Sequence, residues 1–385
     1  MAQSGSMTQK ISGQARILIG CQEVPGYGGA STASYKLFEM MQNDGLDVYY
    51  LNLITQEEAD YLRYMFGEDV GNPRCLANVY TCVLRAPLVT AQPELTNLIR
   101  LLSPDRLVGI GWIAAAVMKR AAPERRLIFI TTGFSQMRQY IREKKVQDFI
   151  SLSHSLQCST RESRLHPDGT HLEQEAAMIS DLIITNSEIV RFLYQHLFYS
   201  QIGKVCPDVI WFAEWIFQDA LGHSGLRISF DERDIDLLFI ASSWMRPEKN
   251  YKLLKEIVSR CKGLQIDLIG EVDEKTPHAN HHGLIATRSD LFSLMGRARI
   301  VVSPSLFDAA PGILFEASVM GCNIIASKNC GNWRICNPSL LVDPFHVDNF
   351  VEKISMALSR KYEDNMDYFL GTNSYRKLIN KILAT

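Results

Sequence analysis

The sequence predicts an α/β protein with two Rossmann-like domains, each built on a parallel sheet. Its 385 residues are too many for one typical core, so two domains are expected. From Ala15 onward, short apolar runs alternate with longer helical patterns, which is typical of parallel strands joined by crossover helices. Residues 221–234 interrupt this alternation with Gly, Ser and charged residues, as a linker does.

The first domain is predicted over residues 8–220, because the polar segment MAQSGSM before it has no place in a fold. Its predicted strands are short apolar runs, namely ARILIGC, DVYYLNL, NVYTCVL, RLVGIGW, RLIFITTG and DLIITNS. The run DVIWFAEWIF, residues 208–217, is expected to be its last strand.

The second domain is predicted over residues 235–360. Its expected strands are DLLFIASSW, LQIDLIGE, GLIATR, RIVVSPS and CNIIAS. Helices are expected over residues 250–260, through Leu291, from Leu314 to Met320, over 347–359 and over 375–383. Residues 361–385 then form a helical tail.

The composition excludes several classes of protein. Hydrophobic residues make up 46% of the chain and charged residues 21%, as in globular proteins, and the net charge of -2 favours no binding to nucleic acid. Nine scattered cysteines without a CxxC pair indicate free thiols in a reducing compartment. No apolar run reaches the ~18 residues of a spanning helix, so we expect a cytoplasmic protein.

Two carboxylates, Asp308 and Glu316, stand eight positions apart around a turn that contains Gly312. Asp308 is expected on the loop after the RIVVSPS strand, and Glu316 in the first turns of the next helix. Ligands bind at that edge of an open α/β sheet, helix starts attract phosphate, and carboxylates accept hydrogen bonds from sugar hydroxyls. The alternative is ordinary helix chemistry, because acids are favoured near any helix N-terminus.

Two other segments offer groups for phosphate. SWMRPEKN, residues 243–250, follows the first strand of the second domain and carries Arg246 and Lys249. GYGGAST, residues 26–32, follows the first strand of the chain, and its Gly28 and Gly29 let backbone amides approach a ligand. Such a glycine-rich loop would also suit a nucleotide cofactor.

Together these residues resemble the retaining glycosyltransferases of the GT-B fold, and in pattern glycosyltransferase family four, the glycosyl transferases group 1. The family pattern of two acids, Ala and Gly is matched by Asp308, Glu316, Ala317 and Gly321. The resemblance covers nearly the whole chain. It implies two parallel sheets facing a central cleft, an acceptor-binding domain at 8–220, a nucleotide-sugar-binding domain at 235–360, and a tail that crosses back to the first domain.

The resemblance also implies roles for residues. Lys249 matches the family's Lys beside the donor diphosphate, but Trp244 occupies the position of its Arg, so Arg246 is the candidate substitute. Asp308 replaces the usual Glu and is one methylene shorter. The implied catalytic residues are Asp308, Lys249 and Arg246; those implied to bind the donor are Glu316, Gly28, Gly29, Gly312, Ile313, Leu314 and Ser243.

The chain departs from the family on the acceptor side. Many members carry a His after a late strand of the first domain, where this chain has Thr131 and Thr132. Thr132 and the nearest histidine, His154, are the acceptor-side candidates, although a lone His is more often a surface or packing residue. The later double glycine of the family is also altered, since Asn332 follows Gly331.

The implied reaction moves a sugar from a nucleotide-diphosphate sugar to an acceptor hydroxyl with retention, by front-face attack and without a cofactor. No Asp-x-Asp signature is present, so metal-independent transfer is expected. Glu274, His278 and His282 have the spacing of helical metal ligands, but Pro277 argues against a helix there, and a solvated loop is expected instead.

The acceptor is expected to be a glycan, a small molecule or a lipid-linked sugar. A basic stretch interleaved with aromatic residues suits peripheral contact of the first domain with the inner membrane face. Its basic residues are Lys119, Arg120, Arg125, Arg126, Arg138, Arg142, Lys144 and Lys145. The alternative is a solvated helix face, because Glu124, Glu143 and Asp148 dilute the charge.

Three other functions remain open from the sequence. A nucleotide-sugar epimerase or hydrolase of the same fold would use the same diphosphate site without an acceptor. A non-catalytic two-domain binding protein would only close on a ligand. A transferase fold that has lost activity is the third, because of Asp308 and Trp244.

Overall fold

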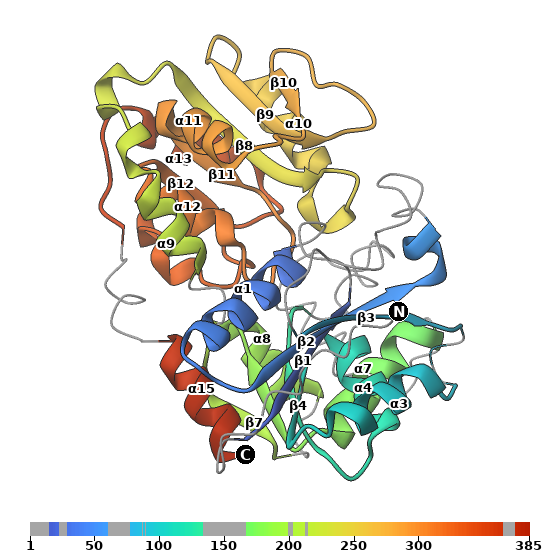
Figure 1. Cartoon of the computed structure of the whole chain (residues 1–385). Coiled ribbons are helices and arrows are strands. Elements are labelled where there is room, and N and C mark those ends of the chain that lie inside the picture. Colours follow the sequence, from blue (N-terminus) through green and yellow to red (C-terminus); the bar gives the residue numbers. More distant parts are fainter. Residues whose placement is uncertain are drawn as a thin grey trace.

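A computed structural model describes residues 15–22, 29–60, 78–86, 88, 90–133, 167–198, 203–211, 215–364 and 374–385. These residues form two α/β units, each with a parallel sheet, one above the other in Figure 1. The predicted fold class is therefore confirmed.

The first sheet has the order β3-β2-β1-β4-β5-β6-β7. Its strands are mostly buried apolar runs, as expected for a parallel sheet covered on both faces. In chain order the elements are β1 (Ile17–Gln22), α1 (Gly29–Asn43), β2 (Val48–Thr55), β3 (Val79–Leu84), α3 (Pro93–Leu102), β4 (Arg106–Ile110), α4 (Trp112–Ala121), β5 (Arg126–Ile130), α7 (Pro167–Ile179), β6 (Leu182–Thr185), α8 (Glu188–Phe192), a π-helical turn (Leu193–Phe198) and β7 (Val205–Val209).

The second sheet has the order β10-β9-β8-β11-β12-β13, so its strand order reverses between β8 and β11. In chain order the elements are α9 (Trp215–Gly222), β8 (Ile235–Ser243), α10 (Tyr251–Arg260), β9 (Ile266–Glu271), β10 (Asn280–Gly283), α11 (Arg288–Arg297), β11 (Ala298–Ser303), α12 (Gly312–Val319), β12 (Asn323–Ser327), β13 (Leu341–Val342), α13 (Val347–Leu358) and α15 (Ser374–Ala384).

Two strand predictions are wrong. β7 ends at Val209, and Trp215–Gly222 form helix α9 instead of the end of a strand. A short apolar run does not by itself distinguish a strand from a buried helix, and here tertiary packing against α12 favours the helix. The run GLIATR is also not a strand, because β10 ends at Gly283, where the backbone has a φ of 66°.

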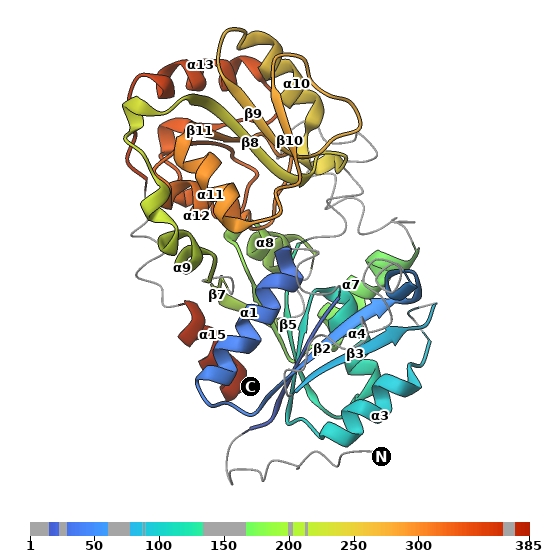
Figure 2. The ribbon, with the colours of Figure 1, turned by 45° about the horizontal axis from the view of Figure 1, so that its top comes forward.

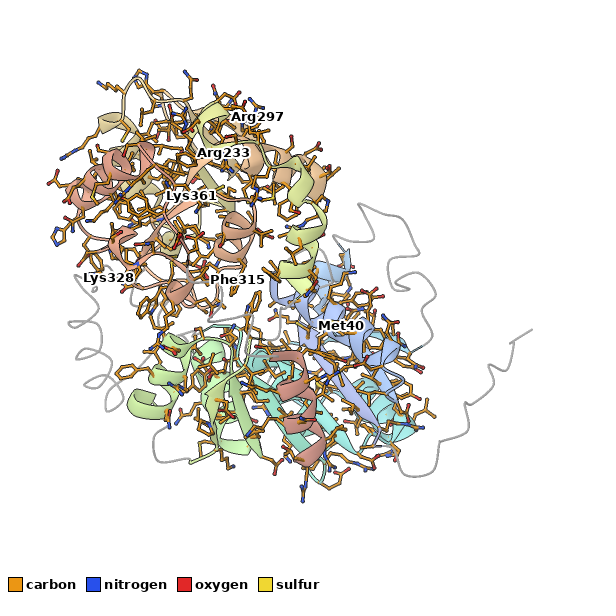
Figure 3. The ribbon with its side chains drawn as sticks, turned by 90° about the vertical axis from the view of Figure 1, so that its left-hand side faces the viewer. Met40, Arg233, Arg297, Phe315, Lys328 and Lys361 are labelled. Carbon is orange, nitrogen blue, oxygen red and sulfur yellow. The ribbon has the colours of Figure 1, made fainter. Side chains whose placement is uncertain are left out.

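The segment that links the two sheets, residues 223–234, is attached to the second domain. It contains two 3-10 turns, Ser224–Leu226 and Phe230–Glu232. Arg233, labelled in Figure 3, is buried and donates to the carbonyl of Ala298 at 2.6 Å and to that of Met320 at 2.9 Å. These bonds attach the end of the segment to the amino-terminal side of β11 and to the end of α12.

The last helix, α15, lies against the first sheet in both Figure 1 and Figure 2. Leu378 and Ile382 are fully buried in a cluster that includes side chains of α1 and β1. Tyr375 donates a hydrogen bond of 2.7 Å to Asp44 just after α1. The chain therefore leaves the second domain after α13 and ends on the first.

Candidate functional site

Three loops meet at the carboxyl edge of the second sheet, after β8, β11 and β12. The amide of Leu306 donates to the carbonyl of Glu248 at 2.9 Å, which joins the first loop to the second. The amide of Asp308 donates to the carbonyl of Asn329 at 3.3 Å, and that of Gly331 to the carbonyl of Asp308 at 2.7 Å. Asp308 is thus held by backbone bonds on both sides, where the strand order of the sheet reverses.

Lys249 and Asp308 form an ion pair within this arrangement. Lys249 ends the 3-10 turn Pro247–Lys249 after β8, and its Nζ lies 2.5 Å from Oδ2 of Asp308. The two side chains are 15% and 19% exposed, so the pair is largely shielded from water. The structure therefore brings together two of the residues predicted from sequence, 59 positions apart.

Arg246 and Trp244 occupy different environments from that pair. Arg246 is bonded to the buried Glu248, with Nη2 2.8 Å from Oε1. Trp244 is 3% exposed and donates from its indole nitrogen to the carbonyl of Ile269 at 2.9 Å. Trp244 is therefore a core residue of the second domain.

Helix α12 begins at the same edge of the sheet. Its N-cap, Pro311, makes no side-chain hydrogen bond to the first turn, formed by Gly312, Ile313 and Leu314. A Cβ at Gly312 would lie 2.8 Å from Cδ1 of Ile216 on α9, so glycine permits close packing of the two helices. The amides of such a turn and the helix dipole favour an anion.

Glu316 lies in the second turn of α12 and is nearly buried. Its Oε1 accepts a hydrogen bond of 2.5 Å from Nη2 of Arg288, the first residue of α11. Nε of the same guanidinium donates to Oδ2 of Asp219 on α9 at 2.7 Å. Burial raises the pKa of the Glu316 carboxyl, and the positive charge of Arg288 opposes that shift.

Arg288 and Asp219 were not predicted from sequence. Arg288 lies 28 positions from Glu316 and 69 from Asp219, and no periodicity or spacing links positions that far apart. The only local signal is the helix start, because Thr287 caps α11 by accepting from the amide of Asp290.

Loops of the two domains touch close to this site. Arg334, after β12, lies 2.9 Å from the carboxylate of Glu188 at the start of α8. A Cβ at Gly331 would lie 2.6 Å from Oγ of Ser187, the N-cap of α8. Phe307, from the loop that carries Asp308, is 4% exposed within a hydrophobic cluster of the first domain. The loops after β11 and β12 therefore contact the carboxyl edge of the first sheet.

An aromatic stack also joins the two domains, between the end of β7 and helix α12. Trp211, just after β7, stacks on Phe315 with ring centroids 3.7 Å apart and an interplanar angle of 8°. Figure 3 shows Phe315 at the side of the second domain nearest the first.

The first-domain candidates are only partly described. Gly28 and His154 lie outside the described residues, and Gly29 is the first residue of α1. Thr132 is half-buried just after β5, and neighbouring Thr131 is fully buried with no hydrogen-bond partner for its hydroxyl in the described parts of the chain. The acceptor-side roles of Thr132 and His154 remain predictions.

Four of the eight residues in the basic stretch of the first domain lie outside the described residues. Lys119 donates to the carbonyl of Arg125, and Arg120 pairs with Glu175. The four that the structure does not describe are Arg138, Arg142, Lys144 and Lys145. Peripheral membrane contact and a cytoplasmic location thus remain predictions. None of the described helices is long and apolar enough to cross a membrane.

The described residues contain no group of three or more His, Cys, Asp or Glu side chains arranged to hold a metal ion. His282 lies 2.7 Å from Oδ2 of the buried Asp267, on the neighbouring strand β9. His282 and Asn280 are thus partners of Asp267, which holds the short edge strand β10 on the sheet.

A known family model matches the domain that carries the site. Residues 234–360 match the family model of glycosyl transferases group 1. Comparison with curated protein sequences finds no match. The match covers the second domain, which carries the Lys249–Asp308 pair and Glu316.

Solved structures of glycosyltransferases share the fold of the whole chain. Sucrose-phosphate synthase from Thermosynechococcus elongatus has a TM-score of 0.62 at 14% identity, over 95% of each chain. The lipopolysaccharide outer core galactosyltransferase WaaB in its apo form has 0.64 at 14% identity, over 96% of this chain and 99% of that one. HepE from Anabaena, in complex with UDP and glucose, has 0.61 at 13% identity, over 97% and 100%. The fold is that of the GT-B glycosyltransferases.

Proposed function

We propose that this protein is a retaining glycosyltransferase that moves a sugar from a nucleotide-diphosphate sugar to an acceptor hydroxyl. The observation that carries the proposal is the meeting of Lys249, Asp308 and the start of α12 at one edge of the second sheet. A fixed cation beside the first-turn amides of a helix suits a diphosphate, and a carboxylate next to it suits sugar hydroxyls. These groups lie within the region that matches the glycosyl transferases group 1 model.

The donor would bind mainly to residues 235–360. Lys249 donates to the diphosphate, because an ammonium has three donors and Asp308 occupies one of them. Asp308 and the first-turn amides of Gly312, Ile313 and Leu314 hold the transferred sugar, and Glu316 accepts from the ribose hydroxyls. Arg246 and Ser243 approach the phosphates from the loop after β8, where Arg246 exchanges part of its bond to Glu248 for the donor.

The acceptor would bind to residues 8–220, across from the donor, with Thr132 and His154 as its candidate contacts, while Gly28 and Gly29 would approach the donor from the first domain. Contacts such as Arg334–Glu188 and Gly331–Ser187 support this arrangement, because they bring the donor loops against the carboxyl edge of the first sheet. The tail, residues 361–385, keeps the two domains joined through α15.

The reaction we propose is a front-face displacement. As the bond between the anomeric carbon and the diphosphate oxygen breaks, the acceptor oxygen bonds to the same face of that carbon, and its proton passes to the leaving phosphate. Lys249 stabilises the negative charge that develops on the diphosphate. Such electrostatic stabilisation is usually the largest single contribution to catalysis. Because this charge comes from the protein, the transfer we propose needs no metal ion.

The first experiment is a thermal-shift screen with UDP, GDP, ADP and CMP and their common sugar conjugates, with magnesium or with chelator. A ligand that binds only the native state raises the unfolding temperature. We expect one nucleoside diphosphate to raise it equally in both conditions. No shift with any nucleotide, in a protein that unfolds cooperatively, would favour a transferase fold without activity or a binding protein.

Proton NMR of the product then tests the chemistry. We expect a glycoside with the anomeric configuration of the donor, formed only when an acceptor is present. Conversion of the nucleotide sugar without an acceptor would identify an epimerase or a hydrolase instead.

A further inference from the structure

We propose that Arg288 is a positioning residue for the donor, which fixes the orientation and the charge of Glu316 and is itself held by Asp219. This inference rests on the proposed function, since it assigns Glu316 to the ribose of a nucleotide. It adds α9, the helix between the two sheets, to the donor site.

The guanidinium of Arg288 bridges two carboxylates from different helices. Nη2 lies 2.5 Å from Oε1 of Glu316 on α12, and Nε lies 2.7 Å from Oδ2 of Asp219 on α9. Two bonds from different nitrogens of one rigid plane fix the direction of the guanidinium, and through it the carboxylate of Glu316.

Burial makes this support necessary. The side chain of Glu316 is 8% exposed, whereas that of Arg288 is 39% exposed and reaches solvent. Desolvation raises the pKa of Glu316, Arg288 opposes the shift, and the negative charge of Asp219 adds to it. Without Arg288, the pKa of this buried carboxyl beside another carboxylate would rise further, so Glu316 would take up a proton at higher pH and lose the charge with which it accepts hydrogen bonds.

The pair leaves Glu316 able to bind a ligand. Its Oε1 is bonded to Arg288, and no described residue donates a hydrogen bond to its Oε2. One carboxylate oxygen thus remains for a hydroxyl donor, while the other fixes the side chain.

Asp219 connects this arrangement to the segment between the domains. It lies on α9, which packs on α12, with Ile216 against Gly312. His223, one turn later, has Nδ1 3.6 Å from Oδ1 of Asp219, and its ring stacks on Phe292 of α11 at 4.7 Å. Among the described residues, the charged and titratable groups around Glu316 are therefore Arg288 from α11 and Asp219 from α9, with His223 behind Asp219.

The test is calorimetric titration of UDP, GDP, ADP and CDP into wild type and variants between about pH 6 and pH 9. We expect Arg288→Met to weaken binding about tenfold or more at neutral pH, with recovery toward high pH as Glu316 ionises. Arg288→Lys keeps the positive charge but not the two-nitrogen bridge. We therefore expect this variant to bind the nucleotide more weakly than wild type, without that pH dependence. Asp219→Asn weakens the hold on Arg288 but also removes a negative charge near Glu316. We therefore expect any loss of nucleotide affinity in this variant to be independent of pH.

The matched control is Arg297→Met. Arg297 is on the same helix, but it pairs with the exposed Asp234, and Figure 3 shows it at the end of the domain away from Phe315. We expect it to bind as wild type. Binding by Arg288→Met as tight as in wild type, or an equal loss at every pH for Arg288→Met and Arg288→Lys, would overturn the inference.

A second measurement needs no nucleotide and separates the two proposals. The carboxyl carbon of Glu316, assigned by its absence in Glu316→Gln, is followed by carbon-13 NMR during pH titration of the unliganded protein. We expect its titration to move to higher pH in Arg288→Met. If no nucleotide binds to wild type but this shift appears, the proposed function fails and the charge support of Glu316 stands. An unchanged titration contradicts the inference, whatever binds.

Discussion

The ammonium of Lys249 and the carboxylate of Asp308 contact each other across two loops of the second domain, with Nζ 2.5 Å from Oδ2. Lys249 follows β8 and Asp308 follows β11, and these strands are neighbours in the sheet. Each residue therefore restrains the other, so that without donor the cation is kept in place by the carboxylate that we assign to the transferred sugar. A rigid charge at this position needs little rearrangement when the leaving group becomes negative.

The first prediction concerns Lys249. Lys249→Met should weaken binding of UDP, or of whichever nucleoside diphosphate binds, about tenfold or more, and lower turnover about 100-fold, because it removes a fixed charge from the diphosphate. Calorimetry and initial rates measure these losses. The matched control is Lys255→Met on α10, where the Lys255 side chain is 40% exposed and pairs with Glu274. Equal effects of the two substitutions would contradict the assignment of Lys249.

The second prediction concerns Trp244, which stands where the family places an Arg. Trp244→Phe should lower the free energy of unfolding by about 1–3 kcal/mol, because the buried carbonyl of Ile269 loses its donor. Trp244→Arg should destabilise more, by placing a charge in the core, and should not improve nucleotide binding. Urea unfolding measures both changes.

The control for Trp244→Phe is Trp112→Phe. The indole nitrogen of Trp112 is buried but has no hydrogen-bond partner among the described residues, so its removal costs no bond. Tighter nucleotide binding by Trp244→Arg would mean that this position still faces the donor, contrary to the structure.

The third prediction concerns the thiols. All seven cysteines in the described part of the chain are buried, and burial raises the pKa to about 11 for Cys82 and Cys322 and to about 12 for Cys330. Because the thiolate is the reactive form, the raised pKa keeps Cys82, Cys322 and Cys330 protonated and unreactive at pH ~8, and burial keeps the reagent from all seven. Titration with Ellman's reagent should therefore label at most Cys75 and Cys158, which lie outside the described residues, until the protein unfolds. Rapid reaction of more than two thiols in the native protein would contradict this.

Much of the fold was predictable because its signals are local. Apolar runs and helical periods predicted most strands of both sheets, and strand–helix alternation predicted their parallel arrangement. The failures also have a local cause, since the apolar run through Trp215 suits either a strand or a buried helix. Only its packing on α12 decides between them.

The site was predictable where spacing carries information. Asp308 and Lys249 were identified from motifs and are in contact, but Arg288 was not identified, because its pairing with Glu316 depends on how three helices pack. Trp244 shows the reverse case. A sequence position can be aligned with a functional residue of a family, yet its side chain turns into the core, and only the tertiary structure shows this.

The last prediction concerns Gly331, in the loop where the second domain meets the first domain. A Cβ there would lie 1.8 Å from the carbonyl oxygen of Ala309 and 2.6 Å from Oγ of Ser187, and the first of these is backbone that cannot rotate away. Gly331→Ala should thus lower the free energy of unfolding by about 1–3 kcal/mol in urea, because the loops after β11 and β12 must separate. Gly225→Ala is the matched control, since nothing lies within 4 Å of its added methyl group. Equal stability of the two variants would show that these loops are not packed against each other, which would also remove the support for a donor site adjoining the first domain.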